Sequence, residues 1–304
     1  APLADDCSFR RYFRVGSGRD RYVVMDAPPD LEDVVPFSTL SDFLNGYGYS
    51  APRILGKDVE NGFLLLDDFG DSTYTKALAS GQNEQALYAL ALDLLVDLRH
   101  RLVDGVPDSV PAYDDEKVLA EAALFIDWYL VPGIELRITD TERELYLAAW
   151  RECLGILRAA PDTLVLRDYH VDNLMVVSGR EGLGACGLLD FQDAVIGPSS
   201  YDVVSLLQDS RRDIAGPLVS AMLDRYFTAM GPYIDRPGFM RSYHAFGAQR
   251  ALKVFGIFTR QSVLYGSHGY LVHISRLWRH TMANLEIPEL RPVREWIDRF
   301  VPAD

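Results

Sequence analysis

The apolar pattern of this 304-residue chain changes character at Asp67-Asp68-Phe69-Gly70-Asp71, a polar segment that directly follows an apolar run. Before it, the chain carries short runs of β-type residues. After it, apolar residues recur every three or four positions over long segments. The first pattern is typical of strands and the second of amphipathic helices. We therefore predict an α+β protein with a small β-rich lobe at residues 1–66, a hinge at 67–71 and a large, mainly helical lobe at 72–304.

Turn residues and apolar spacing predict the individual elements. Gly16-Ser17-Gly18 and Asn61-Gly62 are each flanked by β-type runs and are therefore predicted to be hairpin turns. We expect strands at 9–15, 21–25, 54–59, 63–66, 163–166, 174–177 and 187–189. We expect helices at about 36–46, 82–103, 114–130 and 139–159, and a mainly helical chain from Ser199 onward.

The composition argues against several classes of function. A formal charge of −14 and a pI near 4.8 argue against nucleic acid as the main partner, because phosphate backbones require a clustered positive face. Even the most apolar segment, Ala86–Leu98, contains two aspartates, so we expect no membrane partner. The three cysteines are widely spaced, and the first residues lack a basic, apolar leader. We therefore expect a reduced cytoplasmic protein, and no obligatory protein partner is evident.

Three polar residues around one predicted hairpin have the chemistry of phosphoryl transfer. Asp168 follows a β-rich run, Asn173 lies five residues later, and Asp190 follows the run at 187–189. If 174–177 pairs with 187–189 as an antiparallel hairpin, Asn173 and Asp190 lie at the same end of it. Their oxygens suit Mg²⁺ that bridges nucleotide phosphates. Asp168, on the loop leading in, is predicted to accept the proton of an attacking hydroxyl.

The loop Leu166-Arg167-Asp168-Tyr169-His170-Val171-Asp172-Asn173, followed by Asp190-Phe191-Gln192, resembles the catalytic and metal-binding loops of protein-kinase-like enzymes. The closer resemblance is to the aminoglycoside phosphotransferase and choline kinase superfamily, whose usual loop reads His-Gly-Asp-Leu-His-Pro-Gly-Asn. This chain keeps the Asp, the inner His and the Asn, but it has leucine and arginine at the first two positions. The resemblance implies a bilobal protein-kinase-like fold, the use of ATP and Mg²⁺, and a segment Tyr201-Asp202 whose Asp braces the catalytic loop.

Three segments of the first lobe narrow the likeness to the bacterial anomeric sugar kinases of cell-wall recycling. They are Ser8–Val15, Val24–Pro29 and Leu65–Asp71. Those enzymes use ATP to phosphorylate the C1 hydroxyl of N-acetylmuramate and N-acetylglucosamine, so the likeness implies a small-molecule sugar substrate here. It also implies that residues 5–8, including Ser8, cover the phosphates. Asp67, Asp68 and Phe69 would then form the hinge whose backbone faces adenine.

The lysine that such kinases carry on the third strand is absent. The corresponding run, Tyr22-Val23-Val24-Met25-Asp26, contains none. An arginine of the first hairpin has to replace it. Arg11 and Arg14 are the candidates, but strand alternation puts them on opposite faces, and we take Arg11 into the predicted nucleotide site. The missing lysine keeps a non-catalytic nucleotide-binding regulator open as an alternative, beside an aminoglycoside-type or choline-type kinase.

Other residues near these motifs are interpreted as structural. His170 is expected to orient the loop from inside the core. The pair Asp67-Asp68 is expected to form a hinge with one solvated carboxylate, because neighbouring strand residues point opposite ways. The aromatic-rich segment 243–258 is predicted to be core. An exposed helical face, rather than a site for an anionic sugar, is expected at Arg250, Lys253 and Arg260.

Overall fold

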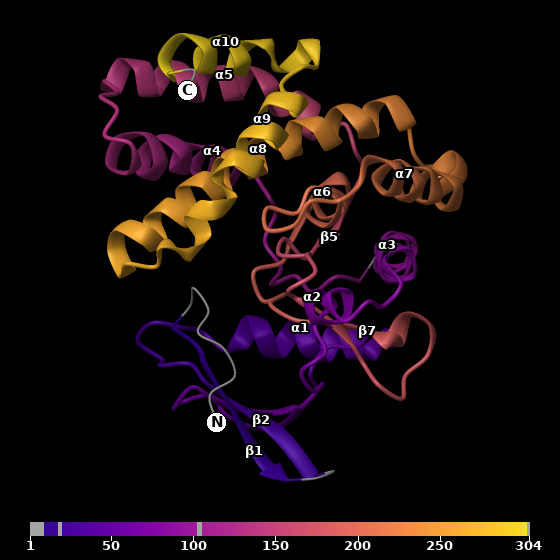
Figure 1. Cartoon of the computed structure of the whole chain (residues 1–304). Coiled ribbons are helices and arrows are strands. Elements are labelled where there is room, and N and C mark those ends of the chain that lie inside the picture. The colour runs from indigo at the N-terminus through magenta and orange to yellow at the C-terminus, as the bar shows by residue number, and fades with distance from the viewer. Residues whose placement is uncertain (1–8, 18–19, 102–104, 303–304) are drawn as a thin grey trace. The chain divides into compact units, whose positions relative to one another are not determined.

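The computed structural model describes residues 9–17, 20–101 and 105–302 (Figure 1). The chain divides into two compact units, each of which is described by itself. Unit 1 comprises Ala1–Pro111 and Leu166–Val195, and unit 2 comprises Ala112–Val165 and Ile196–Asp304. The predicted catalytic loop therefore belongs to the same compact unit as the N-terminal sheet. The functional division at a hinge of residues 67–71 stays a prediction.

Unit 1 contains an antiparallel sheet of four strands in the order β1-β2-β4-β3. The strands are β1 (Arg11–Ser17), β2 (Asp20–Asp26), β3 (Ile54–Asp58) and β4 (Phe63–Asp67). Val24 of β2 lies opposite Phe13 on one side and Leu65 on the other. The two predicted strand pairings are confirmed. The second turn requires Gly62, because its φ is +74° and a Cβ atom there would lie 1.9 Å from the carbonyl oxygen of Ala27.

Helix α1 (Val35–Gly46) packs against β3 of this sheet. Its buried apolar residues Phe37, Leu40 and Leu44 are spaced three and four apart, as the helical pattern predicted. Ser41 lies on the same buried face, and its hydroxyl donates a hydrogen bond of 2.6 Å to the carbonyl oxygen of Pro52. The helix thus covers the sheet edge without leaving that hydroxyl unsatisfied.

The second half of unit 1 contains the predicted catalytic hairpin. Strands β6 (Leu174–Val176) and β7 (Cys186–Leu188) pair antiparallel, and the short helix η2 (Gly182–Ala185) lies between them. Helix α2 (Tyr74–Ala79) packs against β6, and α3 (Glu84–Arg101) packs against β7. The predicted hairpin is confirmed.

Unit 2 is mainly helical, with a single two-stranded pairing of β5 (Asp162–Val165) with β8 (Val195–Pro198) among the described residues. Its first helices are α4 (Asp115–Leu124), the π-helix η1 (Phe125–Gly133) and α5 (Asp140–Leu157). The later ones are α6 (Ser200–Leu207), α7 (Gly216–Met230), η3 (Gly231–Tyr233), α8 (Arg236–Tyr265), η4 (His268–His273), α9 (Ile274–Asn284), η5 (Pro288–Leu290) and α10 (Arg291–Phe300).

Helix α8 is the centre of unit 2, where it packs against α4, α5, α6, α9 and η1 (Figure 1). Gly256 allows the close approach to α4, since a Cβ atom there would lie 2.3 Å from the carbonyl oxygen of Leu124. The aromatic residues of α8 are largely buried, which confirms the predicted core segment. The predicted exposed face is wrong: Arg250 and Lys253 are buried and Arg260 is half-buried. In the described ranges, no helix has the length and apolar character needed to span a membrane.

Candidate active site

The predicted catalytic loop lies between two short backbone turns in unit 1. The amide of Asp168 donates to the carbonyl oxygen of Leu166 at 2.9 Å, and the amide of Asn173 donates to that of His170 at 2.9 Å. Arg167 has a φ of +69°, a left-handed conformation that is uncommon for a side chain other than glycine. Buried Leu166 and His170 hold the loop, whereas Asp168 is half-buried. The backbone thus points Asp168 out of a well-anchored loop, and the burial of His170 agrees with the structural role expected for it.

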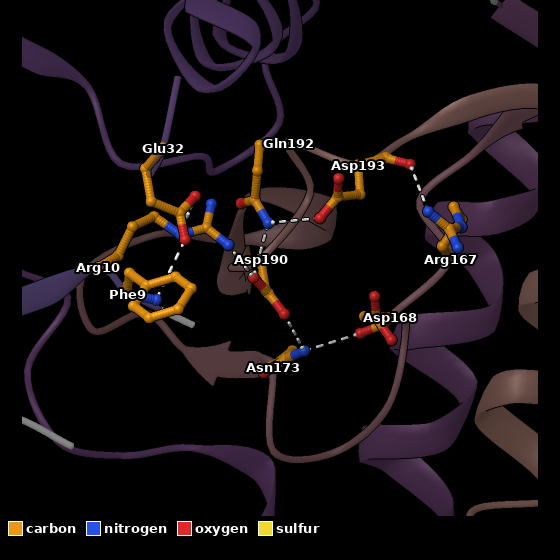
Figure 2. A network of polar contacts seen from close by, with 9 residues as sticks. All are labelled: Phe9, Arg10, Glu32, Arg167, Asp168, Asn173, Asp190, Gln192 and Asp193. Carbon is orange, nitrogen blue, oxygen red and sulfur yellow. Dashed lines mark hydrogen bonds and ion pairs between the residues drawn. The ribbon is translucent and has the colours of Figure 1, made fainter. Parts of the chain in front are cut away.

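The hairpin brings Asn173 and Asp190 together. The amide of Leu189 donates to the carbonyl oxygen of Asn173 at 2.9 Å, which closes the hairpin at this end. The side-chain amide of Asn173 donates to the backbone carbonyl of Asp168 at 3.0 Å and to Oδ2 of Asp190 at 3.4 Å (Figure 2). Gln192 donates to Oδ1 of Asp190 at 2.8 Å. The three residues predicted to do the chemistry therefore lie next to one another.

The donor set of Asn173 and Asp190 fits Mg²⁺ better than a metal held by protein alone. With Nδ2 of Asn173 engaged as a donor, its Oδ1 is a hard oxygen ligand beside the carboxylate of Asp190. Within the described residues, no group of three or more His, Cys, Asp or Glu side chains is arranged to hold a metal ion. Mg²⁺ keeps several waters and is usually bound by one or two side chains plus substrate phosphates. The residues present thus fit the ion that the sequence predicted.

A cavity of about 290 Å³ in unit 1 connects this pair to the sheet. Its apolar wall is formed by Val23, Leu66, Met175 and Leu189. The predicted hinge residues Asp67, Asp68 and Phe69 also line it, as do Asn173 and Asp190. The structure therefore brings five of the predicted site residues to one cavity.

Two other residues were predicted to bind the nucleotide. Ser8 lies outside the described residues. Arg11 forms an ion pair with Asp26 at 2.7 Å, and 64% of its side chain is exposed. Both roles stay predictions.

The segment after β4 is held by buried charges. Only 3% of the Asp68 side chain is exposed, and its carboxylate pairs with Nε of Arg14 at 2.7 Å. Arg14 also pairs with Asp71 at 2.9 Å and donates to the carbonyl oxygen of Gly70 at 3.1 Å. Burial acts to raise the pKa of Asp68, but the bonds from Arg14 and from the amide of Gly70 outweigh it and hold that pKa below its usual value.

The expected solvated carboxylate in this pair is therefore wrong. Asp67 is also half-buried, and it accepts a hydrogen bond of 2.6 Å from Nε of Arg53. The prediction assumed that side chains alternate along the strand, so that either Asp67 or Asp68 points to water. Arginines from β1 and from the segment before β3 instead reach both carboxylates, which the local pattern does not reveal.

Arg10 is a site residue that the sequence analysis missed. Its guanidinium lies 3.6 Å from Oδ1 of Asp190 and 3.8 Å from Oε2 of Glu32, and 9% of its side chain is exposed (Figure 2). Glu32 is fixed in turn, because it accepts a hydrogen bond of 3.1 Å from the amide of Phe9. The available signal was the run of arginines at the start of β1. Arg10 fell inside the strand predicted at 9–15, but β1 begins at Arg11, so strand alternation does not set the direction of its side chain.

Comparison with known proteins places the chain in a family. The sequence profile of the phosphotransferase enzyme family matches residues 1–239. An N-acetylmuramate/N-acetylglucosamine kinase of Pseudomonas aeruginosa is 41% identical over 306 residues, which cover 97% of this chain and 86% of that protein. The resemblance stated from the catalytic loop and the N-terminal segments is confirmed.

Two solved structures share the fold at low identity. A choline/ethanolamine kinase family protein from Mesorhizobium loti aligns with a TM-score of 0.64 and 12% identity over 97% of this chain and 92% of that chain. The ADP-bound aminoglycoside phosphotransferase APH(2'')-Ib aligns with a TM-score of 0.59 and 17% identity over 94% of each chain. The predicted α+β, kinase-like fold class is confirmed.

Proposed function

Because this chain belongs to the phosphotransferase enzyme family, we propose that it uses ATP to phosphorylate the anomeric C1 hydroxyl of N-acetylmuramate and N-acetylglucosamine. The observation that carries the proposal is the convergence of Asp168, Asn173 and Asp190 beside the cavity of unit 1. The relative from Pseudomonas aeruginosa supports the choice of sugar, since the identity extends along nearly the whole chain.

In the proposed reaction, Asp168 accepts the proton of the C1 hydroxyl as the hydroxyl oxygen attacks the γ-phosphorus of ATP. The bond from that phosphorus to the β,γ-bridging oxygen breaks, and ADP leaves. Asn173 orients the loop that carries this base, because its side-chain amide holds the backbone carbonyl of Asp168 at 3.0 Å. Asn173 and Asp190 would hold Mg²⁺, which neutralises phosphate charge when it is bound. Gln192 fixes Asp190 through the 2.8 Å hydrogen bond and so keeps one carboxylate oxygen directed away from Asp168 and Asn173. Positioning of this kind supplies most of the catalysis in phosphoryl transfer.

The cavity is assigned to the nucleotide. Its apolar wall suits the faces of a purine, and Asp67, Asp68 and Phe69 also line it, so their backbone groups are proposed to bind the edge of the base. Asn173 and Asp190 line the same cavity, so phosphates that extend from a bound base meet the proposed metal ligands. The ADP in the aminoglycoside phosphotransferase of the same fold agrees with nucleotide use.

The proposal places the reaction in the cytoplasm, where ATP is available, and makes the sugars of peptidoglycan its substrates. Aminoglycoside-type and choline-type kinases are the rival functions, because solved structures of both kinds share the fold. A non-catalytic regulator is the third, since β2 carries no lysine. The two rival kinases predict acceptors other than an amino sugar, and the regulator predicts no acceptor.

The test is ADP release from Mg²⁺-ATP with a panel of acceptors. We expect turnover with N-acetylglucosamine and N-acetylmuramate, and none with the methyl glycoside of N-acetylglucosamine, whose C1 oxygen is blocked. Turnover with choline or kanamycin, but with neither amino sugar, would reject the proposed substrate. Stabilisation by nucleotide without transfer to any acceptor would instead support the regulator.

A further inference from the structure

Arg10 is a cationic side chain that contacts the proposed metal ligand Asp190. It enters from the residue before β1, and its guanidinium reaches Asp190 at 3.6 Å and Glu32 at 3.8 Å. Both contacts are longer than the 2.7–2.9 Å of a well-formed charge-assisted hydrogen bond. The side chain is nevertheless almost fully buried, so its charge acts on its surroundings with little screening by water. Arg10 is thus a buried cation beside the proposed metal ligand.

The other arginines of the first hairpin are committed to different partners. Arg11 pairs with Asp26 at 2.7 Å and is largely exposed. Arg14 makes short contacts to Asp68, Asp71 and the carbonyl oxygen of Gly70, which together occupy its planar fork. Moving Arg14 would leave the carboxylate of Asp68 buried without this partner, which is strongly destabilising. Arg10 is the member of this run whose guanidinium lies beside the proposed metal ligand Asp190.

We propose that Arg10 binds the phosphates of the nucleotide and so replaces the lysine that the third strand lacks. This inference rests on the proposed function for the identity of the nucleotide. Arginine suits the role because its planar fork can bind two phosphate oxygens at once. When a cation occupies Asp190, that carboxylate no longer attracts Arg10, and the guanidinium turns to the phosphates beside the same carboxylate. Arg10 is therefore a partner-switching residue.

Glu32 is the positioning residue for this switch. It contacts Arg10 and is fixed by the backbone amide of Phe9, so it retains the guanidinium when Asp190 releases it. The pair Arg10–Glu32 thereby limits the positions that the long arginine side chain can adopt. The side chain of Arg10 therefore loses less rotamer freedom when it binds the nucleotide than an unrestrained arginine would.

The test compares dissociation constants for adenosine, AMP and Mg²⁺-ADP by calorimetry, which needs no sugar. In Arg10→Gln we expect Mg²⁺-ADP to bind at least about tenfold more weakly and adenosine to change by less than about twofold, because the lost contact is with phosphate. Arg10→Lys should recover part of the loss, since it keeps the charge but not the fork. Glu32→Gln should weaken Mg²⁺-ADP binding by less than Arg10→Gln.

Three further variants test whether the loss of phosphate binding is specific to Arg10. Arg236→Gln removes an exposed ion pair to Asp224 in unit 2 and should leave all three constants within about twofold. Arg11→Gln and Lys76→Gln test the rival cations, because Arg11 lies on β1 and Lys76 lines the cavity. A phosphate-dependent loss in either of these variants, with Arg10→Gln binding normally, would overturn the inference.

The two proposals fail in different ways. If the wild-type chain binds Mg²⁺-ADP with the expected dependence on Arg10 but phosphorylates no amino sugar, the proposed substrate falls and the role of Arg10 stands. If the wild-type chain phosphorylates the sugars and Arg10→Gln binds Mg²⁺-ADP as tightly as before, only the role of Arg10 falls. Should Arg10→Gln not fold, Arg10→Lys carries the same comparison. If Arg10→Lys binds AMP and Mg²⁺-ADP as tightly as wild type while Arg11→Gln or Lys76→Gln binds them more weakly, the inference is overturned.

Discussion

Each unit of the molecule contains a largely buried cation paired with carboxylates, but the two pairs are built differently. In unit 2, Nζ of Lys253 lies 3.0 Å from Glu121, whose carboxylate also accepts a 2.5 Å hydrogen bond from the hydroxyl of Tyr113. In unit 1, the guanidinium of Arg10 lies 3.6 Å from Asp190 and 3.8 Å from Glu32. About a tenth of the side chain is exposed for Lys253, Glu121 and Arg10, whereas a third is exposed for Asp190.

The difference in contact distance distinguishes a charge pair that stabilises the fold from one that can bind a ligand. A buried ion pair offsets the loss of hydration only when its contacts are short and its remaining hydrogen-bonding groups are satisfied. The pair in unit 2 meets this condition, and aromatic rings of Tyr113 and Tyr201 surround it. The contacts of Arg10 to Asp190 and Glu32 are long, and Asp190 lines a cavity. We infer that the first pair is structural and the second exchangeable.

The largest expected effect is the loss of stability when the structural pair is broken. Lys253→Met leaves the carboxylate of Glu121 buried without its cation, so we expect the free energy of unfolding to fall by about 3–5 kcal/mol. Urea denaturation measures this change in the free energy of unfolding. The double variant Lys253→Met, Glu121→Gln should recover most of the loss, because no buried charge remains. Arg158→Met, which breaks a more exposed pair with Asp115, should cost less than about 1 kcal/mol.

Arg10→Gln tests the other half of the comparison in the same assay. A loose pair beside a cavity contributes little to folding, so this variant should lose less than about 1.5 kcal/mol. If it destabilises the chain as strongly as Lys253→Met does, Arg10 belongs with the structural charges, and the distinction between the two pairs is lost.

The second effect concerns turnover rather than folding. Asp168→Asn should lower kcat by at least about 100-fold, since it removes a general base. Its melting temperature and its dissociation constant for Mg²⁺-ADP should stay close to those of wild type, because the interaction of Asn173 with residue 168 is made by the backbone carbonyl. Asp193→Asn, an exposed carboxylate nearby, is the matched control and should keep kcat within about threefold. Near-normal turnover in Asp168→Asn would remove it from the role of base.

The smallest effect is a pH dependence in unit 2. Burial lowers the pKa of His280 to about 4, and nearby guanidinium groups act in the same direction against an opposing carboxylate. Those guanidinium groups belong to Arg250, Arg276 and Arg279, and the carboxylate belongs to Asp213. With a lower pKa folded than unfolded, the histidine stabilises the fold above about pH 6.5, and this stabilisation is lost as the pH falls toward 4.

We therefore expect His280 to account for about 1 kcal/mol of the stability lost between pH 7.5 and pH 5.5. Urea denaturation of His280→Gln at the two pH values should show a smaller difference than wild type. His100→Gln, at an exposed position, should behave like wild type. An unchanged pH dependence in His280→Gln would show that the burial of this residue does not contribute.

The sequence predicted those features that depend on local pattern and antiparallel geometry. The hairpin of β6 and β7 follows from two short β-type runs, and it brings Asn173 beside Asp190. The partners of the buried cations could not be predicted from the sequence, because they depend on tertiary contacts. Lys253 lies on a helix with other basic residues and was taken as exposed, yet its partner comes from α4. Arg10 was predicted to lie within a strand at 9–15, but in the structure it precedes β1 and contacts Glu32 and Asp190.

The position of the transferred phosphate tests the central claim most directly. N-acetylglucosamine is incubated with Mg²⁺-ATP and the wild-type chain, and the product is examined by phosphorus and proton NMR. We predict a sugar phosphate whose phosphorus couples to the anomeric proton at C1, and no such product with Asp168→Asn at the same enzyme concentration and time. A phosphate at C6, or C1 phosphate formed equally well by Asp168→Asn, would contradict the assignment of this site.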